Sequence, residues 1–180
     1  TITTNDASGT DADVTIDGGT TALVLAASTI DGDLTVRSGN ASGITDSGTV
    51  TVGGNLSATT DANNGLINMN TLVVNGTVAL QTNGSGNATI DNGTTALIIA
   101  QSSVGGSLTL TSGHASGITD SGTVTVGGNL TATTDANNGV IILGTLAVNG
   151  TVALTTNGSG NAAIDNGTTA LIIAQSSVGG

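Results

Sequence analysis

A repeat of 74 residues is the feature that most constrains how this chain can fold. The segment 82–106 returns as 156–180 with one change, Thr89 against Ala163. The string ITDSGTVTVGGNL likewise occupies residues 44–56 and again 118–130. A short repeat cannot bury its apolar side alone, but stacked copies bury a continuous core between them. We therefore expect an elongated solenoid.

Shorter units divide each 74-residue block. Three segments that begin at residues 118, 140 and 170 share one type of ending, and their starts lie 22 and 30 residues apart. The block is thus interpreted as coils of 22, 22 and 30 residues within one solenoid segment, 1–180. The predicted coils are 1–30, 31–52, 53–74, 75–104, 105–126, 127–148 and 149–178. Because the pattern runs to both ends, we expect the chain to be an excerpt of a longer array.

The composition indicates an all-β fold with a thin aliphatic core. The chain has 29 glycines but no Phe, Tyr, Trp, Pro or Cys. Short runs of Val, Ile, Leu and Thr between glycines are typical of strands and turns, and no helical spacing of apolar residues is sustained. Within one coil we expect strands at 107–111, 118–121 and 123–126, with glycine pairs at 105–106 and 127–128 in the turns. Alternation predicts these inward side chains: Leu108, Leu110, Val124, Val126, Leu130, Val152, Leu154 and Val178.

The 30-residue coils each carry eight additional residues. Insertions in solenoids usually emerge as loops on one side. We therefore expect a recurring bulge at 83–93 and 157–167.

The charge excludes some partners. The net charge is −11, because 12 acidic residues stand against the single cation Arg37. Such a surface repels phosphate backbones and anionic lipid, so no nucleic-acid partner is expected. No apolar run approaches the length that crosses a bilayer, so no direct membrane insertion is expected either.

The sequence resembles a known family of repeats. ALVLAASTIDGDLTV at 22–36, followed by GITDSGTVTVGG at 43–54, is similar to the repeats of filamentous-haemagglutinin-type exoproteins of two-partner secretion systems. The resemblance implies a right-handed parallel β-helix, export through an outer-membrane partner, and a place outside a bacterium or on its surface. It further implies the structural shaft of a filament or adhesin. No functional residue is carried over, because such repeats resemble each other as scaffold.

Calcium is the one cofactor for which the sequence offers candidate ligands. Asp61 and Asn63 in one turn, and Asp135 and Asn137 in the equivalent turn, place oxygen-bearing side chains as Ca²⁺ prefers. Both turns lack the fuller spacing of an EF-hand or a calcium-binding roll. The composition favours a turn-forming role for these residues.

No catalytic residue is predicted. His114 is the only histidine, and the equivalent position in the preceding block is Asn40. A triad needs a base beside its nucleophile, and a paired-carboxylate site would interrupt the repeat, whereas the Asp residues recur with it. We expect a non-enzymatic protein without a cofactor.

Unbroken apolar runs indicate a partner surface. A strand directs only alternate residues inward, so Val24, Ile98, Ile142 and Ile172 are expected on the outside. Either the looped insertion covers them, or a neighbouring copy of the rod does, which would give a lateral interface. An alternative function is carbohydrate binding by loops or by the outward Thr and Asn face, with host or matrix glycans as partners.

Overall fold

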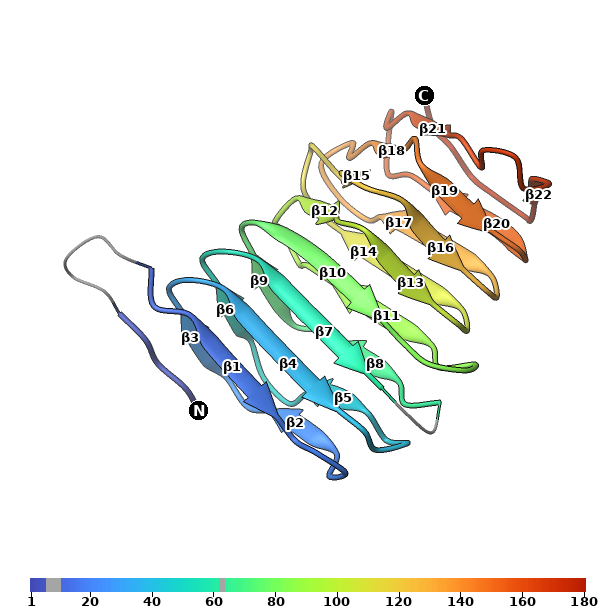
Figure 1. Cartoon of the computed structure of the whole chain (residues 1–180). Coiled ribbons are helices and arrows are strands. Elements are labelled where there is room, and N and C mark those ends of the chain that lie inside the picture. The colour runs from blue at the N-terminus through green and yellow to red at the C-terminus, as the bar shows by residue number, and fades with distance from the viewer. Residues whose placement is uncertain (6–10, 62–63) are drawn as a thin grey trace.

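The chain forms a parallel β-solenoid of about seven turns (Figure 1). The computed structural model describes residues 1–5, 11–61 and 64–180. Within these ranges the chain has strands, turns and bends but no helix, and so nothing helical that could cross a membrane. The two termini lie at opposite ends of the stack. The predicted all-β solenoid is confirmed.

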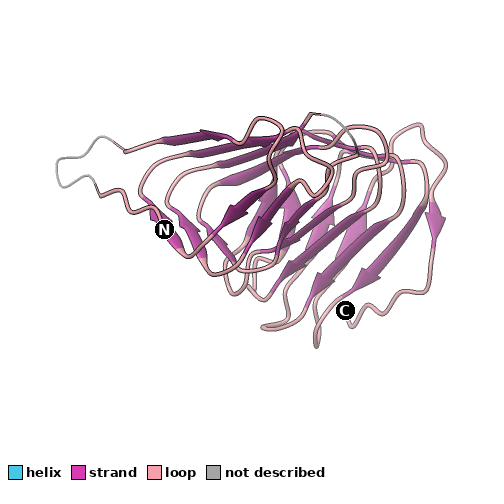
Figure 2. Ribbon diagram, turned by 90° about the horizontal axis from the view of Figure 1, so that it is seen from below, coloured by secondary structure: helices cyan, strands magenta, loops and turns pink. Residues whose placement is uncertain are grey.

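Three sheets run along the rod, and Figure 2 shows their strands as layers around one interior. Sheet 1 has an ordered path of eight strands, namely β1 (Val14–Asp17), β4 (Leu34–Ser38), β7 (Leu56–Thr60), β10 (Thr77–Gln81), β12 (Leu97–Ile99), β15 (Ile118–Asp120), β18 (Ile141–Leu143) and β21 (Ala162–Ile164). A second row of sheet 1 starts from β10 and consists of β13 (Ser102–Val104), β16 (Val124–Val126) and β19 (Leu146–Val148).

Sheet 2 contains β2 (Leu23–Leu25), β5 (Ile44–Asp46), β8 (Ile67–Met69), β11 (Ala88–Asp91), β14 (Leu108–Ser112), β17 (Leu130–Thr134), β20 (Thr151–Thr155) and β22 (Ile172–Ile173). Sheet 3 contains β3 (Ser28–Ile30), β6 (Val50–Val52) and β9 (Leu72–Val74).

Aliphatic side chains stack in columns inside the rod. Leu34 is paired with Leu56, and Leu56 with Val78, all in parallel register and all buried. Seven of the eight predicted inward residues are buried, and β14, β15 and β16 match the predicted strands to within a residue. Val178 is 42% exposed, because it lies in the last coil and no coil covers it in the described structure.

The prediction of 30-residue coils is wrong. Among the described strands, all paired residues are 20 to 23 positions apart, so no step of 30 occurs there. The predicted bulges at 83–93 and 157–167 do not protrude, because they contribute the strands β11 and β21. Ala88 and Ile90 alternate with polar residues and are buried, and a solvent-exposed loop would leave that apolar surface in water.

The extra strand changes how the repeat winds around the rod. Each 74-residue block holds ten strands, so β1 recurs as β11 and again as β21. β1 and β21 are seven steps apart in sheet 1, whereas β11 lies in sheet 2. Two blocks therefore make seven turns, and one block makes three and a half. Equivalent strands of successive blocks consequently alternate between sheets 1 and 2.

The glycine pairs stand in the predicted turns, and close packing of successive coils explains them better than a positive φ does. Gly127 has no positive φ, but a Cβ at this position would lie 2.3 Å from the carbonyl oxygen of Gly105 in the coil beneath. The pair permits close backbone contact between coils. Beside it, side chains connect successive coils, since Asn55 Oδ1 accepts the Thr77 N–H at 2.9 Å and Asn129 Oδ1 accepts that of Thr151 at 2.9 Å.

Candidate functional site

The first proposed calcium turn holds an ion pair. Arg37 Nε donates to Asp61 Oδ2 at 2.7 Å, which connects neighbouring coils. Asn63 lies outside the described residues. The hydrogen bond and the charge of Asp61 raise the pKa of Arg37 above its ordinary value. The guanidinium therefore stays charged at every pH below that ordinary value.

In the second turn, a side-chain amide connects the turn to the neighbouring coil. Asn137 has a φ of +54°, and its side-chain amide donates to the Gly113 carbonyl at 2.6 Å. Asn tolerates this left-handed conformation better than most residues. Within residues 1–5, 11–61 and 64–180, no three His, Cys, Asp or Glu side chains come together as a metal site. Asn137 therefore has a conformation and a hydrogen bond that suit a turn.

His114 takes over the role of a turn asparagine. Its Nδ1 accepts the Ser116 N–H at 3.0 Å, just as Asn40 Oδ1 accepts the Ser42 N–H at 2.9 Å in the preceding block. The imidazole therefore holds a bend, and its partner is the backbone.

The four outward aliphatic residues lie on two different sheets. Val24 and Ile172 are on sheet 2, and Ile98 and Ile142 are on sheet 1, where Thr119 stands between them in the same column. Val24 is 59% and Ile142 50% exposed, whereas Ile98 is half-buried. The insertion does not cover them, since it is itself part of the wall. They form small separate patches and no continuous stripe.

Outward threonines also form columns, and the winding of the repeat divides these columns between sheets 1 and 2. Thr111, Thr133 and Thr155 are in register on sheet 2, whereas the equivalent Thr59 lies on sheet 1. A column of outward threonines therefore extends over three strands of one sheet. The equivalent column of the adjacent block lies on the other side of the rod.

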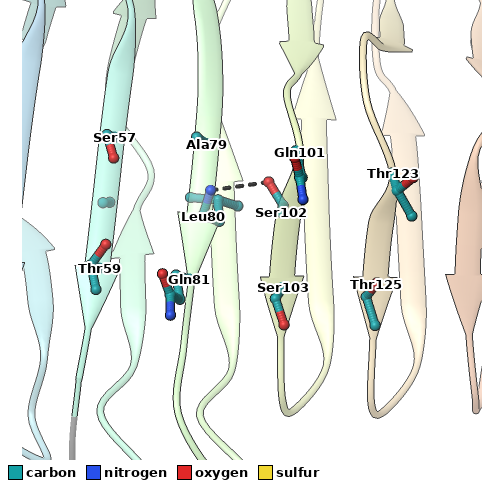
Figure 3. Close-up of a pocket in the computed structure, with 11 residues that line it drawn as sticks. Ser57, Thr59, Ala79, Leu80, Gln81, Gln101, Ser102, Ser103, Thr123 and Thr125 are labelled. Carbon is teal, nitrogen blue, oxygen red and sulfur yellow. Dashed lines mark hydrogen bonds between the residues drawn. The ribbon is translucent and has the colours of Figure 1, made fainter.

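A hollow of about 400 Å³ opens on the outer surface of sheet 1 (Figure 3). Its wall comes from β7, β10, β13 with the connection before it, and β16 with the residue before it. The residues that line it are uncharged and mostly polar, and they are Ser57, Ala58, Thr59, Ala79, Leu80, Gln81, Gln101, Ser102, Ser103, Thr123 and Thr125. Of these, Ala58 and Leu80 have their side chains in the core.

A break in the ladder lies beneath this hollow. Val78 pairs with Ile99 and Gln81 with Ser103, so three residues of the upper coil oppose two of the lower one, as in a bulge. The Ser102 hydroxyl replaces the missing ladder bond, because it accepts the Leu80 N–H at 3.0 Å (Figure 3). It also donates to the Ala100 carbonyl at 2.9 Å.

The hollow was not predicted from the sequence. Its only signal is the string AQSS, at 100–103 and again at 174–177, which marks the point where one block passes into the next. The same serine contact recurs there, since the Leu154 N–H donates to Ser176 Oγ at 3.0 Å. The depth of the hollow depends on which strand lies beneath, and this is a tertiary property.

Comparison with known proteins identifies a repeat family. No curated protein and no solved structure matches the chain. Residues 11–81 and 85–146, together more than half of the chain, match the family described as "Repeats of unknown function" (DUF5649). The chain therefore belongs to the family of repeats of unknown function DUF5649.

Proposed function

We propose that this chain is a structural, non-catalytic shaft of a secreted or cell-surface bacterial filament or adhesin. The observation that carries the proposal is the parallel stacking of successive coils around a continuous aliphatic interior. Each coil contacts only its neighbours, so added coils lengthen the rod without changing its cross-section. The similarity to filamentous-haemagglutinin-type repeats supports the extracellular placement.

The side-chain chemistry suits a rod that stands alone in water. Among the described residues, no buried side-chain nitrogen or oxygen lacks a hydrogen-bond partner. Because these buried groups are hydrogen-bonded, local opening of the rod is unfavourable. Breaking a coil would expose both apolar columns and paired backbone groups to water.

The placement and shape are tested on the native cells. Antibodies against the chain should label intact cells, and electron micrographs should show thin rods of constant width. Labelling only after lysis, or globular particles in place of rods, would overturn the proposal.

We further propose that copies of the rod associate laterally through the exposed aliphatic side chains. The patches around Val24 and Ile142 are small, and the net charge of −11 opposes contact at low ionic strength. Salt screens this repulsion, so association should increase with salt concentration.

The variant Ile142→Asn tests the lateral contact, because Asn68 stands at the equivalent position of the preceding block. Sedimentation velocity in 0.5 M salt should show less self-association of the variant than of the parent chain, while Thr119→Asn in the same column serves as the control. Equal association of all three proteins would remove the proposed interface.

A further inference from the structure

We propose that the hollow on sheet 1 binds a neutral oligosaccharide, and that such a site recurs once in every block on alternating sides of the rod. This inference goes beyond the structural role, because a rod needs no ligand. Ligand titration tests this inference, whereas cell labelling and electron microscopy test the structural role.

The lining offers hydrogen-bonding groups that the protein itself leaves unused. The hydroxyl of Ser102 belongs to the ladder, but no hydrogen bond within the described chain engages the side chains of the other polar residues of the hollow. These residues are Ser57, Thr59, Gln81, Gln101, Ser103, Thr123 and Thr125. Hydroxyls and primary amides donate and accept at once, as the vicinal hydroxyls of a sugar also do.

The absence of charge from the lining of the hollow selects a neutral ligand. Arg37 is in the same column as Thr59 but one coil away, and its guanidinium is paired with Asp61. The negative surface repels anionic sugars. A cation would find no carboxylate in the lining. A polyhydroxylated neutral molecule is the class that these groups fit.

The size of the hollow sets the length of the bound segment. Its volume of about 400 Å³ is near the lower end of the range for ligand pockets and accommodates roughly a disaccharide. Ala79 keeps the centre of the hollow open, because its side chain is smaller than those of Ser57 and Thr35. These two residues occupy the same column in the two preceding coils. The open outer side leaves room for a longer glycan to continue along the surface.

The affinity of one site must be low. The chain has no aromatic ring on which a sugar could stack, and hydrogen bonds exchanged with water contribute little each. A dissociation constant in the millimolar range follows, so useful binding requires several sites on one rod.

The winding of the repeat supplies those sites. The second junction reproduces the pairing on sheet 2, where Thr155 pairs with Ser177 as Gln81 pairs with Ser103 on sheet 1. In a longer array, successive hollows would lie three and a half turns apart, or about 17 Å at the usual strand spacing, and would face different sides. Such a rod could hold two glycan chains together.

The test is a titration of the whole chain followed by backbone amide NMR. The probes are cellotetraose, maltotetraose, mannotetraose and chitotetraose, with tetragalacturonate as the charged comparison. We expect at least one neutral probe to shift the amides of the hollow with a millimolar dissociation constant. No shift with any neutral probe at about 50 mM, a value well above that range, would overturn the proposal, as would tighter binding of tetragalacturonate.

Matched variants localise the site. Ala79→Leu should fill the hollow and weaken binding at least tenfold, and Gln101→Ala should weaken it several-fold. Ala163→Leu changes an outward residue of the same type outside the hollow, so it should leave affinity within twofold. Binding that survives Ala79→Leu, or that falls equally in this control, would place the ligand elsewhere. Circular dichroism of each variant verifies that the rod is intact.

Discussion

Single buried amides close the ladder where two strands of successive coils do not meet. Asn92 is fully buried, and its side chain accepts the Val74 N–H at 2.8 Å while donating to the carbonyls of Val74 at 3.0 Å and Ala96 at 2.8 Å. Asn166 repeats the arrangement around Val148 in the next block. The amide thus replaces a missing strand as the partner of a buried backbone.

Removal of this amide should be costly. Asn92→Ala leaves buried backbone groups without partners, and each such group costs about 1–3 kcal/mol. We expect the free energy of unfolding to fall by about 2–4 kcal/mol, measured by urea denaturation. Asn75→Ala, at an exposed position with no side-chain hydrogen bond within the described chain, is the control and should change it by less than about 0.5 kcal/mol. Equal effects would contradict the assigned role.

At the scale of the strand, alternation decides which substitutions the rod tolerates. In β14, Leu108 and Leu110 are fully buried, whereas Thr109 and Thr111 between and beside them face outward. The inward residues contact the coils above and below, so a change at one position is felt by three coils.

A carboxylate introduced on the inner face of this strand should have a much larger effect on stability than one introduced on the outer face. Leu110→Asp buries a charge without a partner, which costs several kcal/mol, and we expect loss of the β-sheet circular dichroism signal near room temperature. Thr111→Asp should keep that signal and shift the melting temperature by only a few degrees. Retention of structure in Leu110→Asp would refute the packing.

Between strands, backbone contact is the constraint. Gly117 has a φ of +60°, and a Cβ there would lie 1.8 Å from the Val140 carbonyl oxygen of the next coil. Gly144 has neither a positive φ nor any atom within 4 Å of such a Cβ. Two turns of similar composition therefore differ in how closely the coils approach.

This difference predicts opposite outcomes for one type of substitution. Gly117→Ala should lower the unfolding free energy by more than about 2 kcal/mol, because strain and a backbone clash add. Gly144→Ala should be neutral or slightly stabilising, by up to about 1 kcal/mol, through the unfolded chain. Thermal and urea denaturation check both, and a neutral Gly117→Ala would mean that the coils can separate at this turn.

At the scale of the whole molecule, each block makes three and a half turns. The half turn determines on which side of the rod an outward side chain lies. An outward feature encoded once in the repeat is presented on one sheet by one block and on the other sheet by the next. The rod therefore has two chemically similar sides although its sequence repeat is a simple tandem one.

Insertion of further blocks tests this winding. Two additional copies of 75–148, placed between residues 148 and 149, should lengthen the rod by seven turns, or about 34 Å at the usual strand spacing. Coils of 22, 22 and 30 residues would instead add six turns, or about 29 Å. Small-angle X-ray scattering of both proteins gives the increment at constant cross-section, and the shorter value would contradict the register.

Most of the fold was predictable, and the surface site was not. Stacked strands, inward Leu and Val columns and glycine turns follow from local pattern, because alternation and turn chemistry act over a few residues. The error was the insertion: Ala88 and Ile90 alternate as a strand should, yet the extra length alone suggested a loop. The hollow depends on Ala79 lying beneath the bend at Gln101, 22 residues later in the chain, which no local pattern contains.

The sequence by itself determined that this chain is a stack of short parallel strands around an aliphatic interior, since periodicity and the lack of aromatic residues leave no other core. Only the tertiary structure decided how the periods fit together. The number of residues per turn is set by the backbone pairing of successive coils, and 74 residues accommodate three and a half such turns. That half turn decides which side chains become neighbours, and thereby where the hollow and the exposed aliphatic patches lie.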